Sequence, residues 1–317
     1  MPAAFSHWIL GRRIVNSPLF ESEFPNVNKN AFLWGCQGPD IFFYHRLLPW
    51  QKNHSLRKYG GLLHECDPTM LFDSLAKVCR YCLNSDDANT VYSYTLGLCC
   101  HYCYDRRLHP LVYYNIALLE KTDERGCNYK YHCEIESNMD IIMMRYEMNK
   151  LTSEMSMRDC LPDFSGSDKA IARLYSLLLN DMYGIRASSV SVMTLAPDFK
   201  FNLGLLDDKY AVKKPLISSA ERILPMLKEG SFSGLVHTVS EDMGFDYANL
   251  LKSTWFNPSD RSSKSDENLY EITSAAESDT WELIRLFAAA VRDKSNANFE
   301  QFTRGLDFEG RKYAIPF

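Results

Sequence analysis

Histidines and carboxylates recur at four-residue spacing in the first half of the chain. Asp105 follows His101 by four positions and His109 comes four positions later, while His132 and Glu136 repeat the same interval. Residues four apart on a helix lie on one face, about one turn apart. Each pair can therefore direct a nitrogen and an oxygen at the same point, as metal ligands must.

The helix that carries His132 and Glu136 is expected to turn this face inward. Apolar residues such as Ile135 and Met139 occupy the adjoining stripe, and Asp140 continues the ligand face. Leaving a buried carboxylate without a partner is costly, so an inward pair of this kind favours a bound cation. Helical bundles build metal clusters from histidine–carboxylate pairs on facing helices.

Three further candidates lie upstream, which gives five imidazoles and three carboxylates in all. Zinc takes nitrogen and oxygen ligands and keeps an open position when it is catalytic. Eight ligands suffice for two or three zinc ions, with a carboxylate such as Asp105 bridging two of them. Paired ions can activate water and hold the oxygens of a phosphoryl group during displacement. The candidate ligands are His7, Asp40, His64, His101, Asp105, His109, His132 and Glu136.

Some residues with metal-binding side chains are expected to be structural instead. The remaining histidines are of this kind: His45, His54 and His237. Two cysteine pairs, Cys79/Cys82 and Cys100/Cys103, have a spacing that can indicate a four-cysteine zinc site. Both pairs lie inside apolar helical segments rather than on tight turns, so buried thiols acting as small apolar side chains are the simpler interpretation.

Helical periodicity dominates the chain, and strand-like alternation is scarce. We therefore expect an all-α helical bundle with a helical C-terminal extension. Pro110 is expected to end a helix near His109, because the residue before proline disfavours helical geometry. Ser167 is a plausible cap for the helix that follows it. The expected helices are 69–83, 91–105, 111–121, 130–147, 168–183, 216–228 and 278–292, with loop-like breaks at 161–167 and 257–265.

The chemistry is concentrated in the first of two expected regions. Residues 1–150 form the metal-binding helical region, and residues 151–317 form a helical region that either packs into the same domain or stands apart. In the second region only one histidine occurs, His237.

Composition limits the class of partner. The apolar share of 46% and the charged share of 24% are those of an ordinary globular protein, and the net charge is −5. That charge argues against a stable nucleic-acid partner held by a broad basic face. We see no secretion signal and no apolar run long enough to span a membrane, and expect a soluble cytoplasmic protein. The sequence does not indicate an oligomeric state.

Several segments of the first half of the chain, taken together, resemble the zinc-dependent phospholipase C family of bacteria, which is more distantly related to the S1/P1 zinc nucleases. The resemblance covers about residues 2–145, and the combined motif is specific although each piece alone is weak. The segments that carry it occur in order: Pro2 to His7 and Gly11, Gly35-Cys36-Gln37-Gly38-Pro39-Asp40 through Tyr44, Leu63-His64-Glu65, Gly97…His101…Asp105…His109-Pro110, and His132…Glu136. Trp255 to Pro258 followed by Asn268 to Tyr270 also looks like the longer cytosolic members.

The resemblance implies an all-α fold with a three-zinc site. It assigns Asp40, His64, His101 and Asp105 to one zinc, and His109, His132 and Glu136 to a second. His7, with bridging Asp105, would belong to a third, and Asp40 would also be the base that orients the attacking water.

This sequence departs from the secreted enzymes in two respects. Those enzymes complete the third site with a mature N-terminal tryptophan, whereas this chain begins Met1-Pro2, so we expect an incomplete or differently filled third site. The interval from His101 to His109 is also shorter than in the secreted phospholipase.

The expected function is zinc-dependent hydrolysis of a phosphodiester, with a phospholipid as the preferred substrate on family grounds. A zinc-dependent nuclease or small phosphodiesterase is the alternative within the same chemistry. A different class of function also fits the residues: a metal-stabilised helical binding protein that keeps the ligands without turnover.

Overall fold

The computed structural model describes residues 3–51, 55–122, 128–163, 167–187, 189–224, 232–293 and 297–313. Helices make up most of these residues, which confirms the expected all-α class. The first half contains α1 (Ala4–Val15), α2 (Pro18–Glu23), α3 (Lys29–Gly35), η1 (Gly38–Phe42), η2 (Pro49–Gln51), α4 (Arg57–His64), α5 (Pro68–Cys82), α6 (Ala88–Thr122) and α7 (Asn128–Met148). The second half contains η3 (Met157–Cys160), α8 (Ser167–Tyr183), α9 (Ser189–Val192), α10 (Leu195–Leu206), α11 (Lys213–Ile223), β1 (Trp255–Asn257), β2 (Asp260–Ser265), α13 (Leu269–Asp293) and α14 (Phe299–Thr303).

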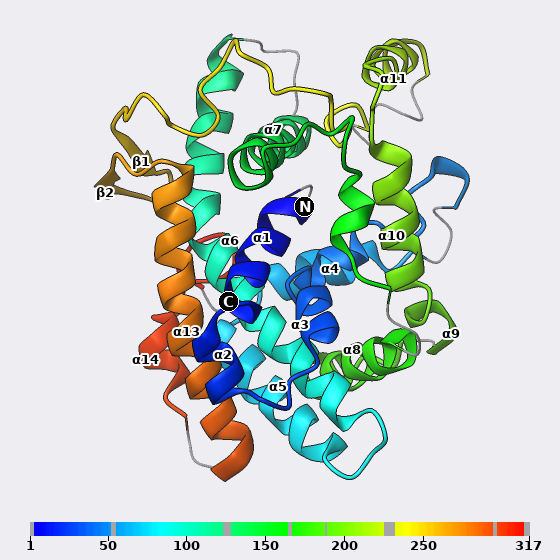
Figure 1. The fold of residues 1–317 in the computed structure, drawn as a ribbon, viewed down its shortest axis with the longest axis vertical. Coiled ribbons are helices and arrows are strands. Elements are labelled where there is room, and N and C mark those ends of the chain that lie inside the picture. The colour runs from blue at the N-terminus through cyan, green and yellow to red at the C-terminus, as the bar shows by residue number, and fades with distance from the viewer. Residues whose placement is uncertain are drawn as a thin grey trace.

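Helix α6 is the central element of the fold. It packs against α3, α7 and α1 from the first half and against α13 from the second, which runs beside it in Figure 1. Its buried side chains belong to a hydrophobic cluster that includes residues from both halves of the chain, from Phe5 to Phe308. A division into regions near residue 150 stays a prediction.

Pro110 does not end a helix, contrary to the sequence-based expectation. Helix α6 runs without interruption from Ala88 to Thr122, so the expected helices 91–105 and 111–121 are one element. Proline removes the donor to the carbonyl four residues earlier and costs about 3 kcal/mol inside a helix. Apolar side chains on both sides of Pro110, including Leu108, Leu111 and Val112, are fully or almost fully buried, and this packing offsets the cost.

The remaining helix predictions agree with the structure to within a few residues, with two differences. The predicted helix 216–228 corresponds to α11, which ends at Ile223, and residues 225–228 lie outside the described part of the chain. The predicted helix 278–292 is the latter part of the longer α13. Helix α8 begins at Ser167 itself, and the side chain of this expected cap is not among those described.

The polar segment 257–265, expected to be a loop, forms most of a β-hairpin. Strands β1 and β2 pair antiparallel, with Trp255 opposite Ser265. Nearly all residues of β2 are exposed, so no apolar alternation marks this strand in the sequence. This small hairpin lies beside the upper part of α6 in Figure 1.

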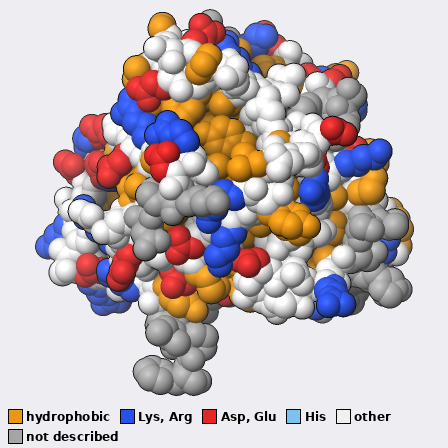
Figure 2. All heavy atoms as spheres, turned by 90° about the horizontal axis from the view of Figure 1, so that it is seen from below, with side chains coloured by type: hydrophobic (Ala, Val, Ile, Leu, Met, Phe, Trp, Pro, Cys, Tyr) orange, Lys and Arg blue, Asp and Glu red, His pale blue; other side chains and the backbone are white. Residues whose placement is uncertain are grey.

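One face of the molecule carries side chains of both charges. Figure 2 shows one face on which Lys and Arg side chains are interspersed with Asp and Glu and with small apolar areas. Among the described helices, none is long and apolar enough to cross a membrane.

Two glycines allow α3 and α6 to approach closely. A Cβ atom added at Gly97 would lie 2.0 Å from the carbonyl oxygen of Phe32 and 2.8 Å from the Cα atom of Gly35. Both obstacles are backbone atoms, so a side chain here forces the helices apart. This contact matters for function because α3 leads directly into the Gly35–Asp40 segment.

We predict that Gly97→Ala lowers the free energy of unfolding by about 1–3 kcal/mol or more, because overpacking at a helix contact displaces backbone. Denaturant unfolding measures the effect. Gly61→Ala is the matched control, since a Cβ atom there meets nothing within 4 Å and the residue lies in helix α4. The control should be neutral or stabilising by about 0.5–1 kcal/mol. Equal stability of the Gly97 variant and the wild type would contradict the close-packing interpretation.

Candidate metal centre

The carboxylate of Asp105 is the point on which three histidines converge. Its oxygens lie 3.0 Å from the Nε2 atom of His7, 3.0 Å from that of His101 and 3.6 Å from that of His64. All four side chains are buried, although they come from α1, α4 and α6. The structure therefore brings ligands distant in sequence to a single acid.

One group of possible ligands consists of Asp40, His64 and His101. Their ligand atoms all lie within 4.8 Å of one another, and the Nε2 atom of His64 is 3.1 Å from an oxygen of Asp40. Element η1 supplies the carboxylate, and α4 supplies His64 at its last residue. This arrangement matches the ligand set that family resemblance implied for the first zinc, with Asp105 adjacent.

A second group consists of His109, His132 and Glu136, also within 4.8 Å. One oxygen of Glu136 is 3.2 Å from His109 Nε2, and the other is 3.1 Å from His132 Nε2. His132 and Glu136 lie one turn apart on α7, as the sequence spacing predicted. His109 belongs to the same helix as His101, but eight residues advance it by about 12 Å along the axis, which places it in a different group.

A third group consists of His7, His101 and Asp105. The ring of His7 stacks on that of His101, with centroids 4.1 Å apart. His101 belongs to this group and to the first, and one nitrogen lone pair binds one ion. A third site that is incomplete or differently filled stays a prediction.

Backbone carbonyls fix the orientation of three of the histidines through their second ring nitrogen. The Nδ1 atom of His64 lies 2.8 Å from the carbonyl oxygen of Gly60. The corresponding distances are 3.0 Å from His101 to Cys36 and 2.7 Å from His109 to Phe308. Each contact assigns the proton to Nδ1 and leaves Nε2 as the ligand atom, an arrangement typical of metal-binding histidines.

The Gly35–Asp40 segment has a geometric reason for its residue types. Gly35 allows α3 to contact α6, and Cys36 offers its carbonyl to His101. Gly38 has a φ of +50°, and a Cβ atom there would lie 2.4 Å from the His101 ring. Only glycine tolerates both the positive φ and the close approach of the His101 ring. The turn that follows places Asp40 in the site.

The polar atoms of this site suit a zinc ion. Among the residues that the structure describes, neither ring nitrogen of His7 has a hydrogen-bond partner, and the same is true of His101 Nε2, although all three atoms are buried. Short approaches to Asp105 without hydrogen-bond geometry are what ligands of a shared cation show. A donor set of imidazole nitrogens and carboxylate oxygens is the one that zinc prefers.

The ionisation of each carboxyl group in the site depends strongly on the charge of the neighbouring histidines, and the reverse is also true. Burial opposes ionisation of Asp105, but His101, His109 and His7 outweigh it and hold the pKa of this carboxyl well below its usual range. Burial likewise opposes protonation of His64, whose pKa is nevertheless raised to about 10 by Asp105 and Asp40. The buried carboxylates are therefore stable only with positive charge nearby, which bound protons or a metal ion can supply.

Asp140 does not join the ligands, although it continues their face in sequence. It accepts hydrogen bonds from the backbone N–H groups of Phe5 and Ser6 at 3.1 and 2.8 Å, at the N-terminus of α1. Its other contacts are the hydroxyl of Ser6 at 2.6 Å and the His237 ring at 3.3 Å. The negative charge suits the positive end of the helix dipole. Asp140 therefore positions α1, and with it His7.

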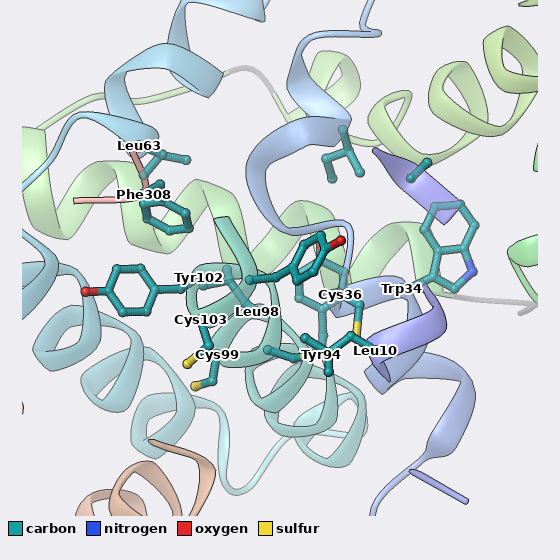
Figure 3. Close-up of a cluster of buried hydrophobic side chains, with 14 of the residues drawn as sticks. Leu10, Trp34, Cys36, Leu63, Tyr94, Leu98, Cys99, Tyr102, Cys103 and Phe308 are labelled. Carbon is teal, nitrogen blue, oxygen red and sulfur yellow. The ribbon is translucent and has the colours of Figure 1, made fainter. Parts of the chain in front are cut away.

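His45, His237 and the cysteines that the structure describes lie outside the three ligand groups. His237 contacts Asp140, and His45 contacts Thr194 and the backbone of Leu56. His54 lies outside the described residues. Within the described ranges, no group of possible metal ligands contains a cysteine. The paired cysteines are buried, and Figure 3 shows Cys99 and Cys103 among apolar side chains.

Sequence reasoning missed two residues near the C-terminus. Phe308 provides the carbonyl that orients His109, and Glu309 lines a cavity of about 230 Å³ together with Asp40, His64 and His132. Burial opposes the charge of Glu309, but His109 and His132 lower its pKa. Neither residue stands at a ligand spacing, so no periodicity marks them.

We predict that Asp105→Asn lowers the zinc content of the purified protein by about one ion per chain, because the amide cannot bridge cations as a carboxylate does. Elemental analysis measures this. Asp181→Asn is the matched control, since Asp181 contacts Lys77 at the surface. Zinc content that stays at the wild-type level in the Asp105 variant would refute the bridging role.

Comparison with known proteins agrees with this geometry. The family model described as zinc dependent phospholipase C matches residues 6–185, which is more than half of the chain and includes all eight predicted ligands. Searches of curated proteins and of solved structures gave no match. A helical fold, three converging ligand groups and this match lead to one conclusion: the chain belongs to the zinc-dependent phospholipase C family.

Proposed function

We propose that this protein is a zinc-dependent hydrolase of phosphodiesters and that its substrate is a phospholipid. The observation that carries the proposal is the pair of ligand groups, Asp40/His64/His101 and His109/His132/Glu136, with Asp105 close to both. Residues of both groups line one cavity. A phosphoryl group in this cavity would meet both groups at once, which is the arrangement that phosphodiester hydrolysis requires.

The two groups would each hold one zinc ion, and His7 with Asp105 would contribute to a third. When bound, zinc supplies Lewis-acid catalysis: it lowers the pKa of water and offsets the charge that develops on the phosphoryl oxygens. His64, His101 and His109 are held by backbone carbonyls, so they need little rearrangement to act as ligands. Such preorganisation is a large part of electrostatic catalysis.

Asp40 is the residue we propose to orient the attacking water and to accept its proton. It lines the cavity and is 2% exposed, so few solvent molecules compete for it. An oxygen–phosphorus bond forms as one ester bond breaks. The departing alcohol takes a proton from solvent, and Asp40 returns its own to solvent. The products are a phosphomonoester and an alcohol.

The walls of the cavity favour a phospholipid over a polyanion. Phe43, Tyr113 and Tyr129 provide aromatic surface, whereas Glu65 and Glu309 place carboxylates beside the ligands. Further phosphates on either side of the cleaved bond would meet these carboxylates and be repelled. A nuclease is therefore the second candidate, consistent with the net charge of −5.

We predict that Glu136→Gln reduces kcat/KM by at least about 100-fold, because the second ligand group loses its only carboxylate. The assay uses a chromogenic phosphodiester and, separately, phosphatidylcholine in micelles. Glu134→Gln is the matched control on the same helix: Glu134 is half-buried and near Lys214, at 3.9 Å, rather than in a ligand group. The control should keep wild-type activity.

Removal of the metal ion tests the same proposal without changing any residue. Dialysis against a chelator should abolish cleavage of both substrates, and added zinc should restore it. Should the protein bind about two zinc ions and cleave neither substrate, the binding-protein hypothesis would replace the hydrolase. Cleavage of single-stranded nucleic acid in preference to phosphatidylcholine would favour the nuclease.

A further inference from the structure

A short C-terminal segment packs directly against the metal centre. We call residues Leu306–Lys312 the strap; its two end residues form an isolated antiparallel bridge. The turn between them is held by Asp307, whose carboxylate accepts hydrogen bonds from the backbone N–H groups of Glu309 and Arg311, both at 2.9 Å. The strap lies more than 100 residues beyond the segment 6–185 that the family model matches.

Specific hydrogen bonds attach the strap to the helices that carry the ligands. The hydroxyl of Tyr102 on α6 donates to the Leu306 carbonyl at 2.6 Å. The backbone N–H of Phe308 donates to the carbonyl of His64, the last residue of α4, at 3.3 Å. On its outer side, the Asn257 amide from β1 donates to the Gly310 carbonyl at 3.1 Å. The strap is therefore fixed at three points.

Phe308 contacts ligands of both groups. Its carbonyl oxygen lies 2.7 Å from His109 Nδ1, and its ring centroid lies 5.0 Å from that of His64 and 5.7 Å from that of His101. Figure 3 shows the ring between Leu63 of α4 and Tyr102 of α6. Phe308 is fully buried, so its position is closely defined.

Glu309 extends the strap into the cavity. Its carboxylate accepts a hydrogen bond from the hydroxyl of Tyr113, whose ring lies 5.6 Å from that of His132. The guanidinium of Arg311 stands over the Tyr113 ring at 4.3 Å and 3.9 Å from the Glu309 carboxylate. This network holds a negative charge beside the His109–His132–Glu136 group without including it among the ligands.

From these contacts we propose that the strap is a working part of the metal centre, with Phe308 as the positioning residue for His109 and Glu309 as a supporting carboxylate. The inference rests on the proposed metal site and adds to it a component from outside the family-matched segment. Groups that orient ligands commonly change metal affinity by 10–100-fold when they are removed. The strap should therefore control how tightly the second group holds its ion.

Gly310→Ala tests the proposal because it displaces the strap without touching a ligand. Gly310 has a φ of +67°, and a Cβ atom there would lie 2.8 Å from the Arg106 carbonyl oxygen and 2.8 Å from the Pro110 ring. Gly184→Ala is the matched control: its φ is +65°, but a Cβ atom meets nothing within 4 Å. Both substitutions strain the backbone equally, and only the first moves the strap.

The measurements are zinc retention against a competing chelator and the visible absorption spectrum of the cobalt-substituted protein. We expect Gly310→Ala to weaken retention of one ion by about 10–100-fold and to shift the cobalt bands. The Gly184 variant should match the wild type in both. Wild-type retention and an unchanged spectrum in the Gly310 variant would overturn the proposal.

A second variant covers the case in which Gly310→Ala fails to fold. Glu309→Gln keeps the shape of the side chain and removes its charge, with Glu300→Gln on α14 as its exposed control. Weaker zinc retention in the Glu309 variant alone supports the strap, and equal retention in both overturns it. Neither readout needs a substrate. A wild-type protein that binds no zinc would instead refute the proposed function itself.

Discussion

The buried negative charge of Asp105 is the constraint on which the rest of the centre depends. A carboxylate that is 2% exposed requires positive charge nearby, and three imidazoles from separate helices approach it within 3.0–3.6 Å. Those imidazoles are themselves held by backbone carbonyls or by stacking, so they cannot move away to solvent. The fold thus places a buried negative charge that cations would stabilise at the position where a phosphodiester would add a second negative charge.

Most of the ligand set could be predicted from the sequence because helical geometry is local. His101 with Asp105, and His132 with Glu136, lie on one face of their helices as their spacing requires. Convergence of His7 and Asp40 with these pairs is not local. It was expected only through the order of motifs that resembles a family, and the structure brings the same residues together.

Several features were beyond prediction for physical reasons. The steric preference of the residue before proline is a local effect, whereas tertiary packing around Pro110 outweighs it here. The hairpin was missed because β2 is polar on both faces. Phe308 acts through its backbone carbonyl, and any residue type has one, so the sequence carries no signal for this role. Asp140 continues the face of His132 and Glu136 on α7, but its carboxylate accepts hydrogen bonds from the N-terminus of α1, a long-range contact that helical spacing does not indicate.

The uninterrupted course of α6 sets the distance between the two ligand groups. His101, Asp105 and His109 belong to one continuous helix. Their separation along its axis is therefore set by the rise of 1.5 Å per residue and not by the length of a loop. Inserting or deleting a single residue between Asp105 and His109 would rotate one end by about 100° relative to the other and turn a ligand away from its ion. A change of length in a connection such as residues 149–156 has no such effect on the ligands, because all eight candidate ligands precede it in the chain.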